Sequence, residues 1–171
     1  DPDGAPLDQC KDLYTHAFII FACAHYWAKV REPLVESVLN AALQVVLEQF
    51  STGNGLYEAS LDQDWSSLGS GPLQNPLMHL AEAFLATLSV REDPTVQSAL
   101  LALTDGMQQH FIEPVHNVML EKPRGAVDNW FEPGHQFEWL FLLASSPLLR
   151  GTALHGSLDR AFGFAEQVGV D

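Results

Sequence analysis

Residues 132–143 read Glu-Pro-Gly-His-Gln-Phe-Glu-Trp-Leu-Phe-Leu-Leu. Pro-Gly is a turn signal, and the apolar run from Phe137 to Leu143 predicts a helix that begins at this turn. In such a helix His135 and Glu138 are three residues apart and lie on one face. An imidazole beside a carboxylate is suited to moving protons near neutral pH. The stretch therefore predicts an acid/base pair at the start of a helix, although a glutamate in a first turn also stabilises an ordinary helix.

Two further helices are expected to begin with polar or titratable side chains. Residues 74–84 read Gln-Asn-Pro-Leu-Met-His-Leu-Ala-Glu-Ala-Phe. Asn75 suits the N-cap of this helix and Pro76 its first position, which puts His79 one turn inside. Tyr14 lies near the start of another apolar helix. Because helix N-termini offer unpaired amides, openings gathered at one end of a helical assembly predict a pocket for sugar or anionic oxygens.

Apolar residues recur at helical spacing in six stretches, with almost no strand pattern, which predicts an all-α protein. The expected helices span residues 13–30, 33–50, 76–90, 94–111, 135–148 and 152–168. Aromatic residues that share this spacing are expected in the core, namely Phe18, Phe21, Trp27, Phe84, Phe137, Trp139 and Phe141.

The connections between these helices alternate between short and long. The long ones, residues 51–73 and 112–133, contain segments 55–59 and 117–121 that fit short strands. Long loops beside helix openings are where binding residues collect. Without a linker or low-complexity tract, residues 1–171 are expected to form a single domain of helical hairpins.

The composition excludes several classes of partner. Among 171 residues, 8 are basic and 22 acidic, a formal net charge of −14. Without clustered cations, nucleic acid and anionic membrane surfaces are poor partners. The sequence contains no apolar run of about 18 residues, the length that would predict a membrane span. Cys10 and Cys23 form neither a CxxC motif nor a disulfide framework, which favours a reducing cytoplasm.

Three segments, DLYTHAF (12–18), QNPLMHLAEA (74–83) and EPGHQFEW (132–139), together resemble the N-acylglucosamine 2-epimerase superfamily, which includes mannose isomerases and cellobiose 2-epimerases. The resemblance covers most of residues 11–145. It implies an (α/α)6 barrel and a sugar isomerisation or epimerisation through an enediol-type intermediate, with histidine acid/base groups and no obligatory cofactor. Twelve helices of about 11 residues with connections of about 5 already need close to 200 residues, so this chain is expected to hold about half of the barrel.

The resemblance also implies roles for particular residues. It places His135 in an acid/base role, Glu138 beside it and His79 at the sugar ring. The substrate-binding groups that it implies are Asn75, Tyr14, Trp130 and Phe131. It implies no metal ion. The family's second catalytic histidine and an arginine contact have no counterpart here, and the partner histidine is expected outside these residues.

The favoured reaction is the isomerisation of a free aldose, D-mannose to D-fructose, because the first two motifs look closer to mannose isomerases. The alternative is 2-epimerisation of N-acetylglucosamine and N-acetylmannosamine, or of cellobiose. Return of the C2 proton to C1 gives a ketose with one base, whereas return to C2 from the opposite face gives an epimer and needs a second acid/base group.

Three other interpretations remain open from the sequence. His79, His135 and Glu138 could supply three metal ligands with an open fourth position, as in hydrolytic zinc sites, although no HExxH motif supports this. A helical binding module would leave the same side chains packed and solvated. A half-barrel also exposes the inner faces of its helices, so a folded but inactive fragment that self-associates is a further expectation.

Overall fold

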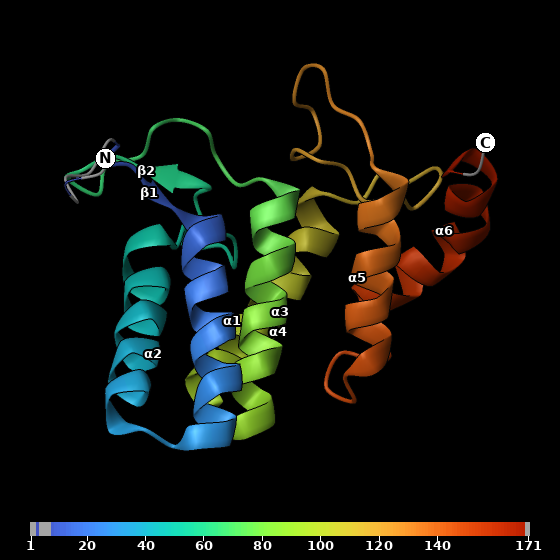
Figure 1. Ribbon diagram of the computed structural model, residues 1–171. Coiled ribbons are helices and arrows are strands. Elements are labelled where there is room, and N and C mark those ends of the chain that lie inside the picture. The colour runs from blue at the N-terminus through green and yellow to red at the C-terminus, as the bar shows by residue number, and fades with distance from the viewer. Residues whose placement is uncertain (1–2, 4–7, 170–171) are drawn as a thin grey trace.

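The computed structural model describes residues 3 and 8–169 (Figure 1). Within this part of the chain there are six α-helices, as the sequence predicts. They are α1 (Leu13–Val30), α2 (Pro33–Val45), α3 (Gln74–Val90), α4 (Pro94–His110), α5 (Pro133–Ser145) and α6 (Ala153–Gly169). A π-helical turn, η1 (Val46–Phe50), continues α2 and completes the helix expected over 33–50.

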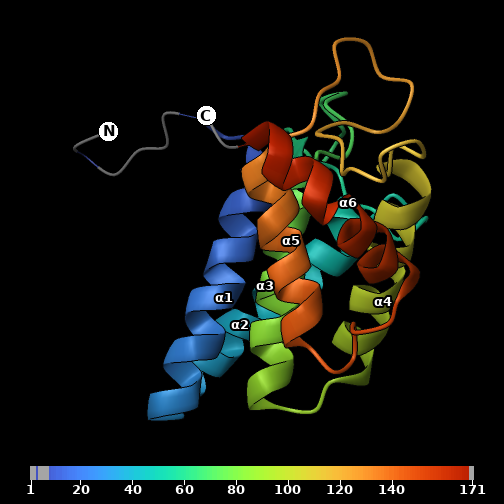
Figure 2. The same ribbon diagram turned by 90° about the vertical axis from the view of Figure 1, so that its right-hand side faces the viewer.

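The helices form two layers of opposite direction. Helices α1, α3 and α5 stand in a row with their N-termini at one end, and α2, α4 and α6 run back the other way (Figures 1 and 2). Within the row, α1 packs on α3 and α3 on α5, and each of them also packs on the helix that follows it in sequence. This arrangement places the three helix openings considered above at the same end of the molecule.

Strands are short and sit at the same end as the helix openings. Strand β1 (Lys11–Asp12) pairs antiparallel with β2 (Ser60–Leu61), and Lys11 lies opposite Leu61. The prediction of strands over 55–59 and 117–121 is wrong. Those segments form only isolated bridges, Ser51 with Tyr57 and Ile112 with Met119.

Hydrogen bonds at the first residues of α1 and α3 hold the N-terminal ends of these helices in place. The Asp12 carboxylate caps α1 by accepting from the Thr15 N–H at 2.7 Å. The N-cap expected at Asn75 is wrong, because α3 already begins at Gln74 and Leu73 precedes it without a side-chain cap. Instead, the Gln74 N–H donates to the carbonyl of Glu121 at 3.0 Å. A neighbouring loop therefore satisfies one of the amides at the helix start that have no partner within the helix.

The core lies between the two layers. The aromatic residues expected in it differ in how far they are buried. Phe84 and Trp139 are fully buried, as expected. The prediction of core positions is wrong for Phe18 and Phe141, which are 39% and 69% exposed. Phe18 of α1 lies beside His79 of α3, with 4.9 Å between ring centroids, and Phe141 of α5 lines a groove between α5 and α3. Both side chains therefore border open space beside α3 and not the packed core between the layers.

Among the described residues, no helix is both long enough and apolar enough to cross a membrane.

Candidate active site

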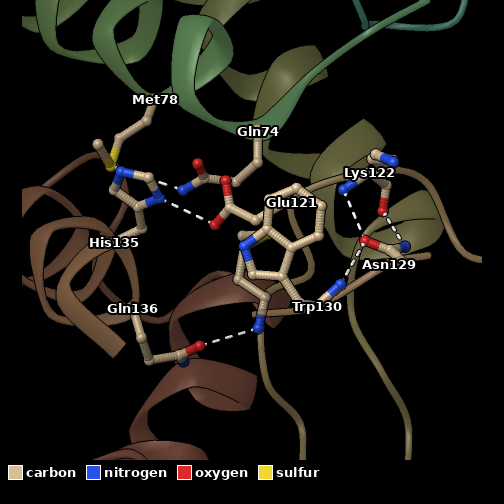
Figure 3. Close-up of polar contacts among 9 residues, drawn as sticks. Gln74, Met78, Glu121, Lys122, Asn129, Trp130, His135 and Gln136 are labelled. Atoms are coloured by element: carbon tan, nitrogen blue, oxygen red, sulfur yellow. Dashed lines mark hydrogen bonds and ion pairs between the residues drawn. The ribbon is translucent and has the colours of Figure 1, made fainter. Parts of the chain in front are cut away.

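His135 forms the centre of the site, at the N-terminal end of α5. Its Nδ1 lies 2.8 Å from Oε1 of Glu121, and the two side chains are 25% and 11% exposed (Figure 3). An ionised carboxylate can only accept a hydrogen bond, so this contact places the ring proton on Nδ1. Nε2 then carries the free lone pair of the neutral imidazole. The pair can take up a proton at Nε2, because the carboxylate stabilises the imidazolium that results.

Glu121 replaces Glu138 as the partner expected for His135. The sequence places Glu138 on the same helical face, but the carboxylate that reaches the imidazole comes from the loop between α4 and α5. Its backbone is fixed on both sides: the Glu121 carbonyl accepts from Gln74, and its N–H donates to the carbonyl of Trp130 at 2.9 Å. The only signal in the sequence was that Glu121 ends a segment considered as a strand, which does not reveal where that segment docks.

Glu113 organises the beginning of the same loop. Its carboxylate accepts from the backbone N–H of His116 at 2.7 Å and of Val115 at 2.8 Å. These hydrogen bonds, that of His116 foremost, lower the pKa of the Glu113 carboxyl. The His116 ring also stacks on Phe164 of α6, with 4.5 Å between ring centroids. The loop that carries Glu121 is therefore held at its start as well as near its end.

A second histidine–carboxylate pair lies on α3. Nδ1 of His79 is 3.2 Å from Oε2 of Glu82, three residues later on the same helix. The edge of the Tyr14 ring approaches the His79 ring with 5.0 Å between centroids, and Phe18 lies at 4.9 Å. The structure thus brings together His79 and Tyr14, two of the residues that the sequence assigned to the site. As at His135, a carboxylate at Nδ1 leaves Nε2 available.

A groove of about 350 Å³ lies between α3 and α5, and Glu138 is one of its lining residues. It is lined by Met78, His79, Glu82, Phe137, Glu138, Phe141 and Leu142. Glu138 therefore faces the groove shared with His79, on the wall opposite Glu82. The apolar walls and a few polar groups are typical of a small-molecule site.

The other expected binding residues lie around the N-terminal ends of α3 and α5. The Asn75 side chain has a buried Oδ1 without a hydrogen-bond partner among the described residues. Trp130 is 53% exposed, and the Lys122 Nζ lies 5.2 Å from the centre of its indole ring. Phe131 packs instead toward α6, with its ring centroid 5.8 Å from that of Phe164. Asn75 thus has an unsatisfied buried acceptor and Trp130 an exposed ring, whereas Phe131 is partly engaged.

The metal-site interpretation does not fit the geometry. Over residues 3 and 8–169, no grouping of three or more His, Cys, Asp or Glu side chains is close enough to hold a metal ion. His79, His135 and Glu138 therefore do not form the three-ligand set considered from the sequence.

The fold and the site define a protein of the α/α toroid class with carboxylate-paired histidines at the N-terminal ends of its inner helices. The family model of N-acylglucosamine 2-epimerase (GlcNAc 2-epimerase) matches residues 1–167, and the chain belongs to this family. The resemblance seen in the three sequence motifs is thereby confirmed.

Relatives of this chain are longer proteins. It is 27% identical over 175 residues to a D-mannose isomerase of Pseudomonas cannabina pv. alisalensis, covering 92% of this chain and 42% of the relative. A crystal structure of a D-mannose isomerase matches 96% of the chain and 45% of its own, with 21% identity and a TM-score of 0.79. The cellobiose 2-epimerase from Spirochaeta thermophila DSM 6192 matches 97% of the chain and 46% of its own, with 23% identity and a TM-score of 0.79. The chain thus has the toroid fold over less than half the length of these proteins, as the half-barrel prediction requires.

Proposed function

We propose that this chain carries acid/base groups of a sugar isomerase or epimerase that moves the C2 proton of a free aldose through an enediolate, with D-mannose to D-fructose as the favoured reaction. The observation that carries the proposal is the His135–Glu121 pair, which leaves a basic Nε2 on α5, one helical turn before Glu138, a residue of the groove that also holds His79. Family membership supports carbohydrate isomerase or epimerase chemistry.

In the proposed reaction, Nε2 of His135 removes the proton from C2 of the open-chain sugar. Glu121 stabilises the imidazolium that forms, which lowers the barrier to enediolate formation. Return of the proton to C1 by the same imidazole, together with transfer of the O2 proton to O1, gives the ketose on one face. Epimerisation instead needs a second acid/base group on the opposite face of the sugar, so one imidazole is sufficient only for the isomerase.

The second pair has a complementary role in the proposal. Glu82 holds Nδ1 of His79, so that Nε2 can accept or return a proton at a sugar oxygen during ring opening. Glu138 faces the same groove and is placed to accept hydrogen bonds from sugar hydroxyls. This assignment differs from a direct role beside His135, a position that Glu121 occupies.

Binding is assigned to the polar and aromatic side chains around the pairs. The Asn75 amide has a buried oxygen without a partner among the described residues, which a sugar hydroxyl would satisfy on entering the site, and the exposed Trp130 indole can stack on a sugar face. Tyr14, which contacts His79, completes the proposed binding groups on α1. Phe131 is assigned a weaker, wall-forming contribution because Phe164 already contacts it.

The choice of mannose rests on relatives. Two D-mannose isomerases, from Pseudomonas cannabina pv. alisalensis and Marinomonas mediterranea, match the chain with 27% and 23% identity. The alternative, 2-epimerisation of N-acetylglucosamine and N-acetylmannosamine or of cellobiose, is supported by the name of the family and by the cellobiose 2-epimerase fold match.

Deuterium incorporation tests the proposal. The chain is incubated in D₂O with mannose, N-acetylmannosamine or cellobiose, and proton NMR follows exchange at C2 and the appearance of fructose. His135→Gln is expected to slow exchange by about 10²–10⁴-fold. His25→Gln is the matched control, because His25 is exposed on α1, twelve residues beyond the start of that helix. A His135→Gln variant that exchanges deuterium at the parent rate would contradict the proposal.

Self-association is also proposed, because Phe18 and Phe141 expose aromatic surface on the first and last helices of the row. Light scattering coupled to gel filtration should show a mass that rises with concentration, and Phe141→Ser should reduce it. A monomer at all concentrations would contradict this expectation.

A further inference from the structure

Gln136 follows His135 directly and has a buried side chain with an unusual distribution of hydrogen bonds. It is 1% exposed. Its Oε1 accepts from the backbone N–H of Met119 at 2.8 Å (Figure 3), while its Nε2 is buried without a hydrogen-bond partner among the described residues. A leucine or methionine of similar volume would remove the unpaired Nε2 but would leave the buried Met119 N–H without its acceptor. Packing alone therefore does not explain why a glutamine is found here.

The hydrogen bond of Gln136 fixes the segment that carries Glu121. Met119 lies two residues before Glu121, so the two α-carbons are within about 7 Å of each other. The other contacts that hold Glu121, from Gln74 and to Trp130, are made by backbone groups and do not depend on the side chains at those positions. Gln136 supplies a side-chain contact to this segment, and it does so from the same helical turn that carries His135.

We propose that Gln136 is a positioning residue that acts on His135 through Glu121. By holding the Met119 N–H, it fixes the distance between the loop and α5, and this distance decides whether the Glu121 carboxylate reaches Nδ1. A displacement of about 1 Å would lengthen the 2.8 Å contact beyond hydrogen-bond range. The ring proton would then be shared between Nδ1 and Nε2, and the fraction of imidazole with a basic Nε2 would fall.

The consequence for catalysis rests on the proposed function. If His135 removes the C2 proton, loss of the Gln136 contact should lower kcat by about 10- to 100-fold, as small misplacements of reacting groups do. KM should change little, because Gln136 is buried and is not among the residues that line the groove. The consequence for the His135 tautomer does not depend on any activity and can be measured without substrate.

Nitrogen-15 NMR of the labelled chain tests the inference. In the parent, His135 should show the tautomer with the proton on Nδ1 and a protected Nδ1–H signal. Gln136→Met, close in volume, removes the acceptor and should give mixed tautomers and lose this signal while circular dichroism shows a folded chain. Gln136→Glu keeps an acceptor oxygen for the Met119 N–H and should restore the parent spectrum. If the methionine variant does not fold, Gln136→Asn, whose shorter amide does not reach Met119, replaces it.

The outcomes separate this inference from the proposed function. A folded Gln136→Met or Gln136→Asn chain with the parent tautomer at His135 would overturn the positioning role, whatever the activity. A changed tautomer in a chain whose parent shows no sugar exchange would support the positioning role independently of the proposed function. A changed tautomer together with a fall in kcat at constant KM would support both.

Discussion

Nδ1 of His135 lies 2.8 Å from Oε1 of Glu121, across 14 residues of chain. The contact joins the first turn of α5 to the loop that follows α4, and the same loop accepts a hydrogen bond from the first residue of α3. The imidazole is therefore oriented by two helices and a loop together. A histidine held in this way has one nitrogen committed and the other free, which is the arrangement that general acid/base catalysis requires.

Glu121→Gln tests whether the charge of the Glu121 side chain, and not only its size, is needed at His135. The amide is similar in size but carries no charge and can present its NH₂ group to Nδ1, which would move the ring proton to Nε2. Exchange at C2 is expected to fall by about 100-fold. Glu132→Gln, at the exposed N-cap of α5, is the control and should retain parent activity. A Glu121→Gln chain with the parent rate of deuterium exchange would exclude Glu121 from the acid/base unit.

Glu138→Gln should affect binding more than turnover. Glu138 lines the groove between α3 and α5, and an ionised acceptor there would be lost as a partner for sugar hydroxyls. Hydrogen bonds to charged groups are worth about 1.5–3 kcal/mol, so KM should rise by roughly tenfold or more with a smaller change in kcat. Initial rates at varied sugar concentration measure the two parameters. A fall in kcat at unchanged KM would instead return Glu138 to a role in the proton transfer.

The fold could be predicted from the sequence because its signals are local. Helical spacing of apolar residues and prolines near the starts of α2, α4 and α5 locate these helices within a few residues. The exposure of Phe18 and Phe141 could not be predicted in this way, because helical spacing shows only that these residues share a face. Whether that face packs in the core or borders a groove depends on how closely the neighbouring helices approach, as α3 and α5 do beside Phe141.

The candidate site could be predicted only in part. The three motifs locate His79 and His135 at helices whose openings share one end of the molecule. The partner of His135 could not be found, because spacing along a helix favours Glu138 and says nothing of a loop that docks from elsewhere. The same limit explains the error at Asn75: α3 begins one residue earlier, at Gln74, whose N–H donates to the Glu121 carbonyl of the same loop.

Gly55 and Gly53 form a matched pair for testing the loop that precedes β2. Both have φ of +82°, but a Cβ at Gly55 would collide with the backbone carbonyl of Ala102, whereas nothing lies within 4 Å of one at Gly53. Gly53→Ala should lower the free energy of unfolding by about 1–2 kcal/mol, because alanine is disfavoured in the left-handed conformation. Gly55→Ala adds overpacking against a helix backbone and should lower the free energy of unfolding by about 3 kcal/mol or more. Urea unfolding measures both, and equal losses would show that α4 does not constrain this loop.

Tyr57 should make the protein less stable at alkaline pH. Burial raises its pKa to about 12 from an ordinary value of 10.0, and its ring packs near Phe84 with 6.3 Å between centroids. Because the folded-state pKa is higher, the contribution of Tyr57 is fully present below pH 10 and is lost as the pH rises toward 12. The loss amounts to about 2–3 kcal/mol over this range. Urea unfolding of Tyr57→Phe at a series of pH values should lack this part of the decline, while Tyr26→Phe, at an exposed position of α1, should retain it. If both variants declined as the parent does, the phenol of Tyr57 would have to ionise in the folded chain as readily as in the unfolded one.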